Sequence, residues 1–217
     1  MTIRDAFRLR RGFVPCLLAA LVFSTGALAQ GPSTAHIFLM RIWQQGVNTP
    51  QNMGYLPLAE AEAKAALLHA NKALDAFGDP VAVNRELMEV VHALDPAREE
   101  QGESLGFGLT HAAASIMAFM QTAMMRPDAS GNVKEKGKDV AASADHVIET
   151  AREAQILADE FRKTPGQKKA ELVTIRDDIA TALSGRDENG DGTISAKEGG
   201  LQQIRAVMAK MLQGEGF

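Results

Sequence analysis

The fold is decided by residues 140–161, which read VAASADHVIETAREAQILADEF. Small and apolar side chains recur there at alternating spacings of four and three residues. They are Val140, Ala144, Val147, Ala151, Ala154, Ala158 and Phe161. This spacing is typical of a helix that packs through one narrow face, and alanine on that face lets a neighbouring helix approach closely. We therefore expect a long helix over 135–163 within a helical bundle.

Prolines mark the ends of further helices on both sides of this segment. Proline is tolerated in the first turn of a helix and breaks its interior, so its positions divide the chain into helical units. The expected helices span 34–46, 58–77, 80–93, 104–125, 135–163, 168–185 and 196–213. No stretch alternates β-branched with polar residues, so we predict an all-α protein. A helical bundle over 30–165 would be followed, after the break at Lys163-Thr164-Pro165-Gly166, by a helix-loop-helix unit over 166–217.

Residues 1–29 have the features of a secretory signal peptide. A basic start at Arg8, Arg10 and Arg11 precedes an apolar run over 13–28, and the run ends in an A-x-A cleavage pattern. We expect a mature chain that begins at Gln30 and a periplasmic or secreted location. A retained anchor helix is the alternative, although the run is short for a membrane span. The only cysteine, Cys16, lies in this segment, so the mature chain would hold no disulfide and no thiol ligand.

Composition and charge exclude some partners. The 217 residues include 23 Lys and Arg against 27 Asp and Glu, and a net charge of −4 gives no electrostatic footprint for nucleic acid. Residues 104–125 carry no formal charge and are long enough to cross a bilayer. Their glycines, hydroxyl side chains and alanines would gain little from lipid. We therefore expect a helix buried nearly all round in the bundle, and no membrane span in the mature chain.

Residues 187–198, DENGDGTISAKE, carry the clearest chemical signal in the chain. They fit the pattern D-x-[DN]-x-[DN]-G-x5-E at each specified position. Ca²⁺ takes about six to eight oxygen ligands at about 2.3–2.6 Å, and the loop offers oxygens at alternate positions around the turn at Gly192. The predicted ligands are Asp187, Asn189, Asp191, the backbone carbonyl of Thr193, Ser195 directly or through a water, and Glu198. The alternative is an ordinary polar turn in which Ser195 and Glu198 form a capping box.

Residues 170–212 resemble an EF-hand, a family of Ca²⁺-binding helix-loop-helix units. The resemblance implies that Ile194 packs against a partner loop. Two features depart from the family. Gly199 and Gly200 follow the final glutamate, so the exiting helix is expected to start late or at an unusual angle. The hand also stands alone, because the polar segment 128–139 has no glycine at the sixth position.

The lone hand leaves two ways to cover Ile194. It can dock on the helical bundle of the same chain, where the uncharged helix 104–125 offers apolar surface, or it can pair with a second copy. We expect docking within one chain and a monomer, with a calcium-dependent homodimer as the alternative.

The sequence thus predicts a non-catalytic exported protein that binds one Ca²⁺ as a structural ion or as a low-affinity sensor or buffer. No nucleophile motif or phosphate-binding glycine loop supports an enzyme, and no protein partner is indicated. The alternative is a periplasmic helical bundle that binds a transition metal or haem through histidine and methionine. Its candidate histidines are His36, His69, His92, His111 and His146, of which His69 and His146 are expected to be partly exposed.

Overall fold

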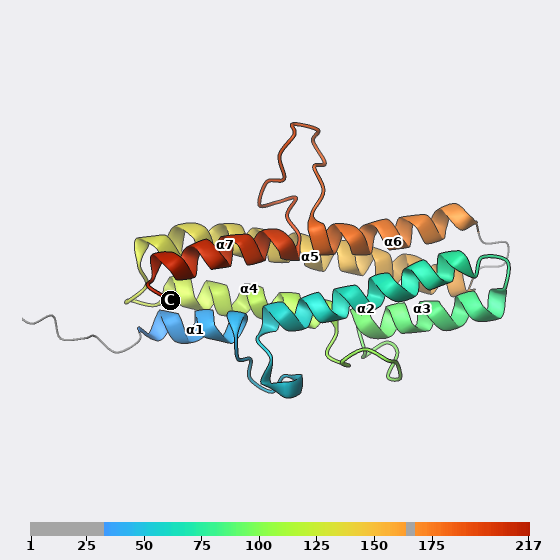
Figure 1. Cartoon of the computed structure of the whole chain (residues 1–217), viewed down its shortest axis with the longest axis horizontal. Helices are drawn as coiled ribbons and strands as arrows, with labels where there is room; N and C mark the ends of the chain where they lie inside the picture. The colour runs from blue at the N-terminus through green and yellow to red at the C-terminus, as the bar shows by residue number, and fades with distance from the viewer. Residues whose placement is uncertain (1–32, 164–167) are drawn as a thin grey trace, which may run out of the picture. The chain divides into compact units, whose positions relative to one another are not determined.

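The computed structural model describes residues 33–163 and 168–217. These residues form seven α-helices and one 3-10 helix and contain no strand, which confirms the all-α prediction (Figure 1). The helices are α1 (Thr34–Trp43), η1 (Pro50–Asn52), α2 (Tyr55–Asp75), α3 (Pro80–Leu94), α4 (Leu109–Met125), α5 (Gly131–Lys163), α6 (Lys169–Ser184) and α7 (Leu201–Gly214). The predicted signal peptide and most of the predicted break after Lys163 lie outside the described residues.

The narrow stripe of α5 is at the centre of the packing. Helices α3, α4, α6 and α7 all pack on α5, and the seven stripe residues from Val140 to Phe161 are at most 4% exposed. Ser130 begins the helix, since its hydroxyl accepts the backbone N–H of Val133 in the manner of an N-cap. Because the side chains on the stripe are small, four helices can pack against α5 in one hydrophobic core.

The last two helices belong to this same core. Buried residues of α6 and α7 are continuous with those of α1 to α5, and the described residues of these helices form one compact unit. The predicted boundary between residues 165 and 166 falls outside the described residues. Helix α7 packs mainly on α5 and also contacts α2, where Arg205 pairs with Glu60 at 2.7 Å (Nη2 to Oε2). Helix α7 therefore packs on the bundle of the same chain, and the docking of Ile194 stays a prediction.

Helix α4 starts at Leu109, five residues later than expected. Gly106 and Gly108 have φ angles of 71° and 85°, a left-handed conformation that interrupts the helix and suits glycine. The fully buried carboxylate of Glu62 on α2 accepts the backbone N–H groups of Phe107 at 2.8 Å and Gly108 at 3.1 Å. Glu62 Oε1 thus supplies an acceptor for two backbone N–H groups just before α4.

Burial of α4 is confined to one side, so the expectation of burial nearly all round was wrong. Ile116 and Met120 are fully buried, whereas Met125 is 83% exposed. Within the described ranges, no helix is both long enough and apolar enough to cross a membrane.

The packing of α5 predicts that its stripe does not tolerate larger side chains. Ala154→Leu adds three carbons at a position with no exposed surface, and we expect it to lower the free energy of unfolding by about 1–3 kcal/mol. Chemical denaturation followed by circular dichroism measures this change. As a control on the same helix, Ile156→Ala removes carbons from a side chain that is 55% exposed and should shift stability by less than about 0.5 kcal/mol. Equal losses in the two variants would contradict the buried stripe.

Candidate metal centre

Residues 185–200 project from the junction of α6 and α7, which lie one after the other along the same row (Figure 1). The base of this loop is narrow. The backbone N–H of Arg186 donates to the carbonyl of Glu198 at 3.1 Å, and a Cβ on Gly200 would lie 2.5 Å from the nitrogen of Gly185. The loop therefore leaves and re-enters the helical row at one point. Helix α7 begins only at Leu201, five residues later than the expected start at 196.

The first three predicted ligands are held by backbone N–H groups of the loop itself. Asp187 accepts three of them: Oδ1 from Gly190 at 2.7 Å and Asp191 at 3.2 Å, and Oδ2 from Gly192 at 2.8 Å. Asn189 Oδ1 accepts the N–H of Asp191 at 2.8 Å. These bonds orient the side-chain oxygens of Asp187 and Asn189 towards the loop backbone, although Asn189 is exposed.

The third predicted ligand, Asp191, is held by hydrogen bonds from Thr193. Asp191 Oδ1 accepts both the hydroxyl of Thr193, at 2.6 Å, and its backbone N–H, at 2.9 Å. The hydrogen bonds from Thr193, the hydroxyl first, hold the pKa of Asp191 below its ordinary value. A carboxylate with a lowered pKa stays ionised over a wider pH range, as a cation ligand requires.

Glu198 spans the two arms of the loop from its base. Its Oε1 accepts the N–H groups of Glu188 at 3.3 Å and Asn189 at 3.2 Å, and its Oε2 accepts that of Ser195 at 3.0 Å. The residue is only 6% exposed. Hydrogen bonds from Ser195 hold the pKa of Glu198 below its ordinary value. The bond with Ser195 agrees with the predicted capping contact, and the bonds to 188 and 189 go beyond it.

The donor set fits a hard divalent cation in its chemistry. The predicted ligands offer oxygen only. Asp187 Oδ2, Asn189 Oδ1 and Glu198 Oε2 each accept one N–H and keep a second lone pair, whereas the other bonded oxygens of Asp187, Asp191 and Glu198 each accept two hydrogen bonds. The oxygens are not gathered into a cluster: in the part of the chain that the structure describes, no group of three His, Cys, Asp or Glu side chains lies close enough to hold a metal. Metal binding would therefore require the loop to close.

Two polar residues on α5 contact this loop, and neither contact was predicted from the sequence, although His146 was a candidate transition-metal or haem ligand. Ser143 Oγ donates to the carbonyl of Ala196 at 2.9 Å, and His146 Nδ1 lies 3.1 Å from the carbonyl of Gly199. Both side chains are buried, although His146 was expected to be partly exposed. The one signal in the sequence is that they are polar and lie beside the stripe residues 140, 144 and 147.

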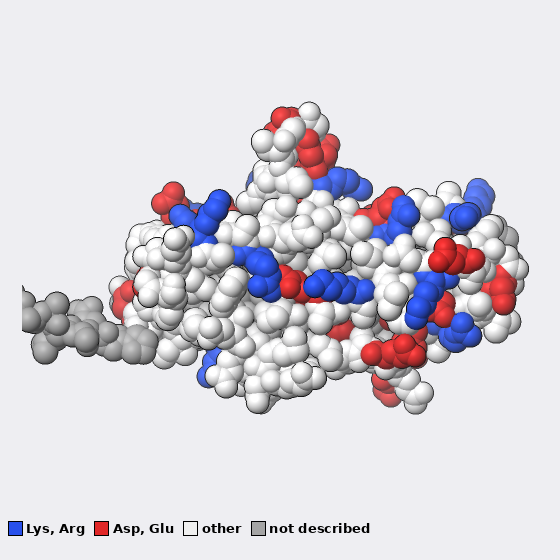
Figure 2. All heavy atoms as spheres, in the orientation of Figure 1, with Lys and Arg blue, Asp and Glu red and all other residues white. Residues whose placement is uncertain are grey.

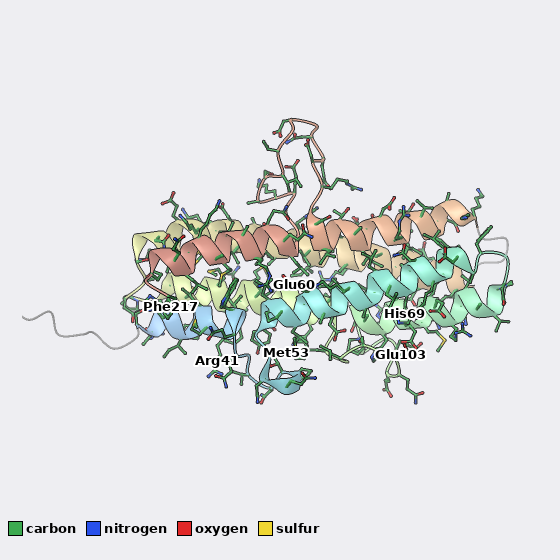
Figure 3. All side chains as sticks on the ribbon, viewed as in Figure 1. Arg41, Met53, Glu60, His69, Glu103 and Phe217 are labelled. Atoms are coloured by element: carbon green, nitrogen blue, oxygen red, sulfur yellow. The ribbon has the colours of Figure 1, made fainter. Side chains whose placement is uncertain are left out.

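The other candidate histidines have separate partners. His69, buried against expectation, pairs with Glu86 at 2.9 Å and lies 3.9 Å from Glu103 (Figure 3). Burial raises the pKa of Glu86, but hydrogen bonds from His69 and Arg85 outweigh it and hold that pKa below its ordinary value. His36 pairs with Glu215 and packs edge-on against Phe217, His92 bonds the carbonyl of Glu99, and His111 stacks on Phe107.

Comparisons of the chain with protein-family models, curated proteins and solved structures found no match. The case for a function therefore rests on the geometry and chemistry of the loop itself.

The hydrogen bonds within the loop predict its acid behaviour without calcium. Carboxyl titrations followed by NMR should give midpoints for Asp191 and Glu198 below about 3.9 and 4.3, the ordinary values. Because both pKa values are lowered by folding, their contribution to stability is present above the ordinary pKa and is lost as pH falls through the folded one. Thr193→Val should raise the midpoint of Asp191 and leave that of Glu198 unchanged. A midpoint for Asp191 that does not respond to this substitution would contradict the assigned bonds.

Proposed function

We propose that this is an exported helical protein that binds one Ca²⁺ through residues 187–198, in a structural role or as a low-affinity sensor or buffer. The observation that carries the proposal is the run of oxygen donors at alternate loop positions, with Asp187 and Glu198 held towards the loop by its own backbone. The acidic side chains on the projecting loop are visible in Figure 2, where charges of both signs are interspersed along the helices.

The hydrogen bonds within the loop also support a modest affinity for Ca²⁺. Three carboxylates, those of Asp187, Asp191 and Glu198, would supply the charge that attracts the ion. Loop closure would have to exchange or share some of their N–H contacts and order residues that are now exposed. We therefore expect a dissociation constant of about 10⁻⁵ to 10⁻³ M, between sensors and extracellular modules.

Removal of either end ligand should abolish binding and leave the fold intact. Calorimetric titration of Ca²⁺ into the wild-type protein should give one site per chain in this range, and Glu198→Gln or Asp187→Ala should give no saturable heat. Both variants should keep their helical circular dichroism, because α6 and α7 are held by buried apolar residues rather than by the loop.

The control is Lys197→Gln, which removes an exposed charge from the same loop at a position that is not a predicted ligand. It should bind one Ca²⁺ with an affinity within a few-fold of wild type. No binding by the wild-type protein at millimolar Ca²⁺ would refute the proposed function.

The exposed side chain of Ile194 bears on the oligomeric state. It is 39% exposed and contacts the loop base, since a Cβ on Gly185 would lie 2.9 Å from its Cγ2. With α7 already covered by α5 and α2, we propose a monomer with and without Ca²⁺. Sedimentation at both conditions tests this. If Ca²⁺ produces a dimer that Ile194→Asp prevents while binding persists, the loop pairs with its own copy.

A further inference from the structure

The C-terminal arm of the loop is fastened to α5. Ser143 and His146 lie about one helical turn apart on α5 and are 2% and 7% exposed. Ser143 donates to the carbonyl of Ala196, and His146 to that of Gly199. The second bond requires a proton on Nδ1, because a carbonyl oxygen can only accept. These two anchor points bracket Glu198 on either side.

The glycine after Glu198 makes this attachment possible. A Cβ on Gly199 would lie 2.5 Å from Ser143 Oγ, closer than real Cβ atoms come to any neighbour. A larger residue would force either the Ser143 hydroxyl or the arm to move, and either movement disturbs the bond from Ser143 to Ala196. The glycine that departs from the EF-hand pattern thus has a local reason, which is the close approach of the loop to a helix outside the helix-loop-helix unit.

From this arrangement we infer that Ser143 and His146 are positioning residues for the calcium site. The inference rests on the proposed function. By holding the backbone on both sides of Glu198 they reduce the conformational freedom that Ca²⁺ binding would otherwise have to remove. Coupling between two equilibria is reciprocal, so Ca²⁺ in turn strengthens the attachment of the loop to α5. The long helix of the bundle thereby regulates the affinity of the loop and responds to its occupancy.

Calorimetric Ca²⁺ titrations of the full chain and its α5 variants test the inference. Ser143→Ala removes one donor to the loop. His146→Leu removes the donor to Gly199 and also the contact of His146 Nε2 with Glu188 Oε1 at 3.5 Å. Each variant should raise the dissociation constant by at least about threefold to tenfold, as expected for one hydrogen bond. His146→Gln retains a side-chain N–H and should recover part of the loss.

The control for general destabilisation is Thr150→Val on the same helix. Thr150 is 5% exposed, and its hydroxyl donates only to backbone carbonyls of α5, His146 at 2.9 Å and Val147 at 3.3 Å. Thermal unfolding without Ca²⁺ should show that Thr150→Val lowers the melting temperature, while its dissociation constant stays at the wild-type value. A purely structural role for Ser143 would make Ser143→Ala behave in the same way.

The outcomes separate the two proposals. If the wild-type protein binds Ca²⁺ and both donor deletions leave its dissociation constant unchanged, the inference is overturned and the proposed function stands. If the wild-type protein binds no Ca²⁺, both fall. Amide hydrogen exchange of the wild-type protein provides a test that needs no variant to fold. Ca²⁺ should slow exchange in α5 around residues 143–150 and not in α3, and equal effects in the two helices would overturn the inference.

Discussion

The close approach of four helices to α5 is the constraint on which the rest of the structure depends. Alanines at positions 144, 151, 154 and 158 have no exposed surface, and their size lets α3, α4, α6 and α7 lie against one helix. Protein interiors are close-packed, so contacts of this kind fix the rotation and position of α5 relative to each neighbour. Any polar side chain beside the stripe is then enclosed by those neighbours as well.

Enclosed polar groups need hydrogen-bond partners. Several polar side chains of α5 have their partners in the segments just before α7 and at its C-terminal end. Ser143 and His146 bond to the loop before α7. At the opposite end, Asn132 donates to the carboxylate of Glu215 and to the carbonyl of Met211. Helix α7 is therefore tied to α5 near both of its ends, and its apolar face fills the space between them.

Local patterns predicted what depends on local sequence. The helices and the α5 stripe follow from periodicity and proline positions, and the oxygen donors of the loop follow from a twelve-residue motif. Contacts between distant residues could not be predicted in this way. The start of α4 depends on Glu62, more than forty residues away, and the loop meets α5 through partners 53 residues apart. Gly199 and Gly200 therefore indicated only a weak helix start, whereas in the structure they allow close contact with Ser143 and Gly185.

The arrangement of α7 limits what Ca²⁺ could do to the helices. An opening of the helix pair would expose Leu201, Ile204, Met208 and Met211, which have no exposed surface now. Each costs about 1.5–3 kcal/mol to transfer to water. A ligand at one hundred times its dissociation constant supplies only about 2.7 kcal/mol. Occupancy of this loop would therefore be too weak to separate α7 from α5. We infer that a calcium response is confined to the loop and its anchors on α5, which favours a structural or buffering role over exposure of an apolar groove.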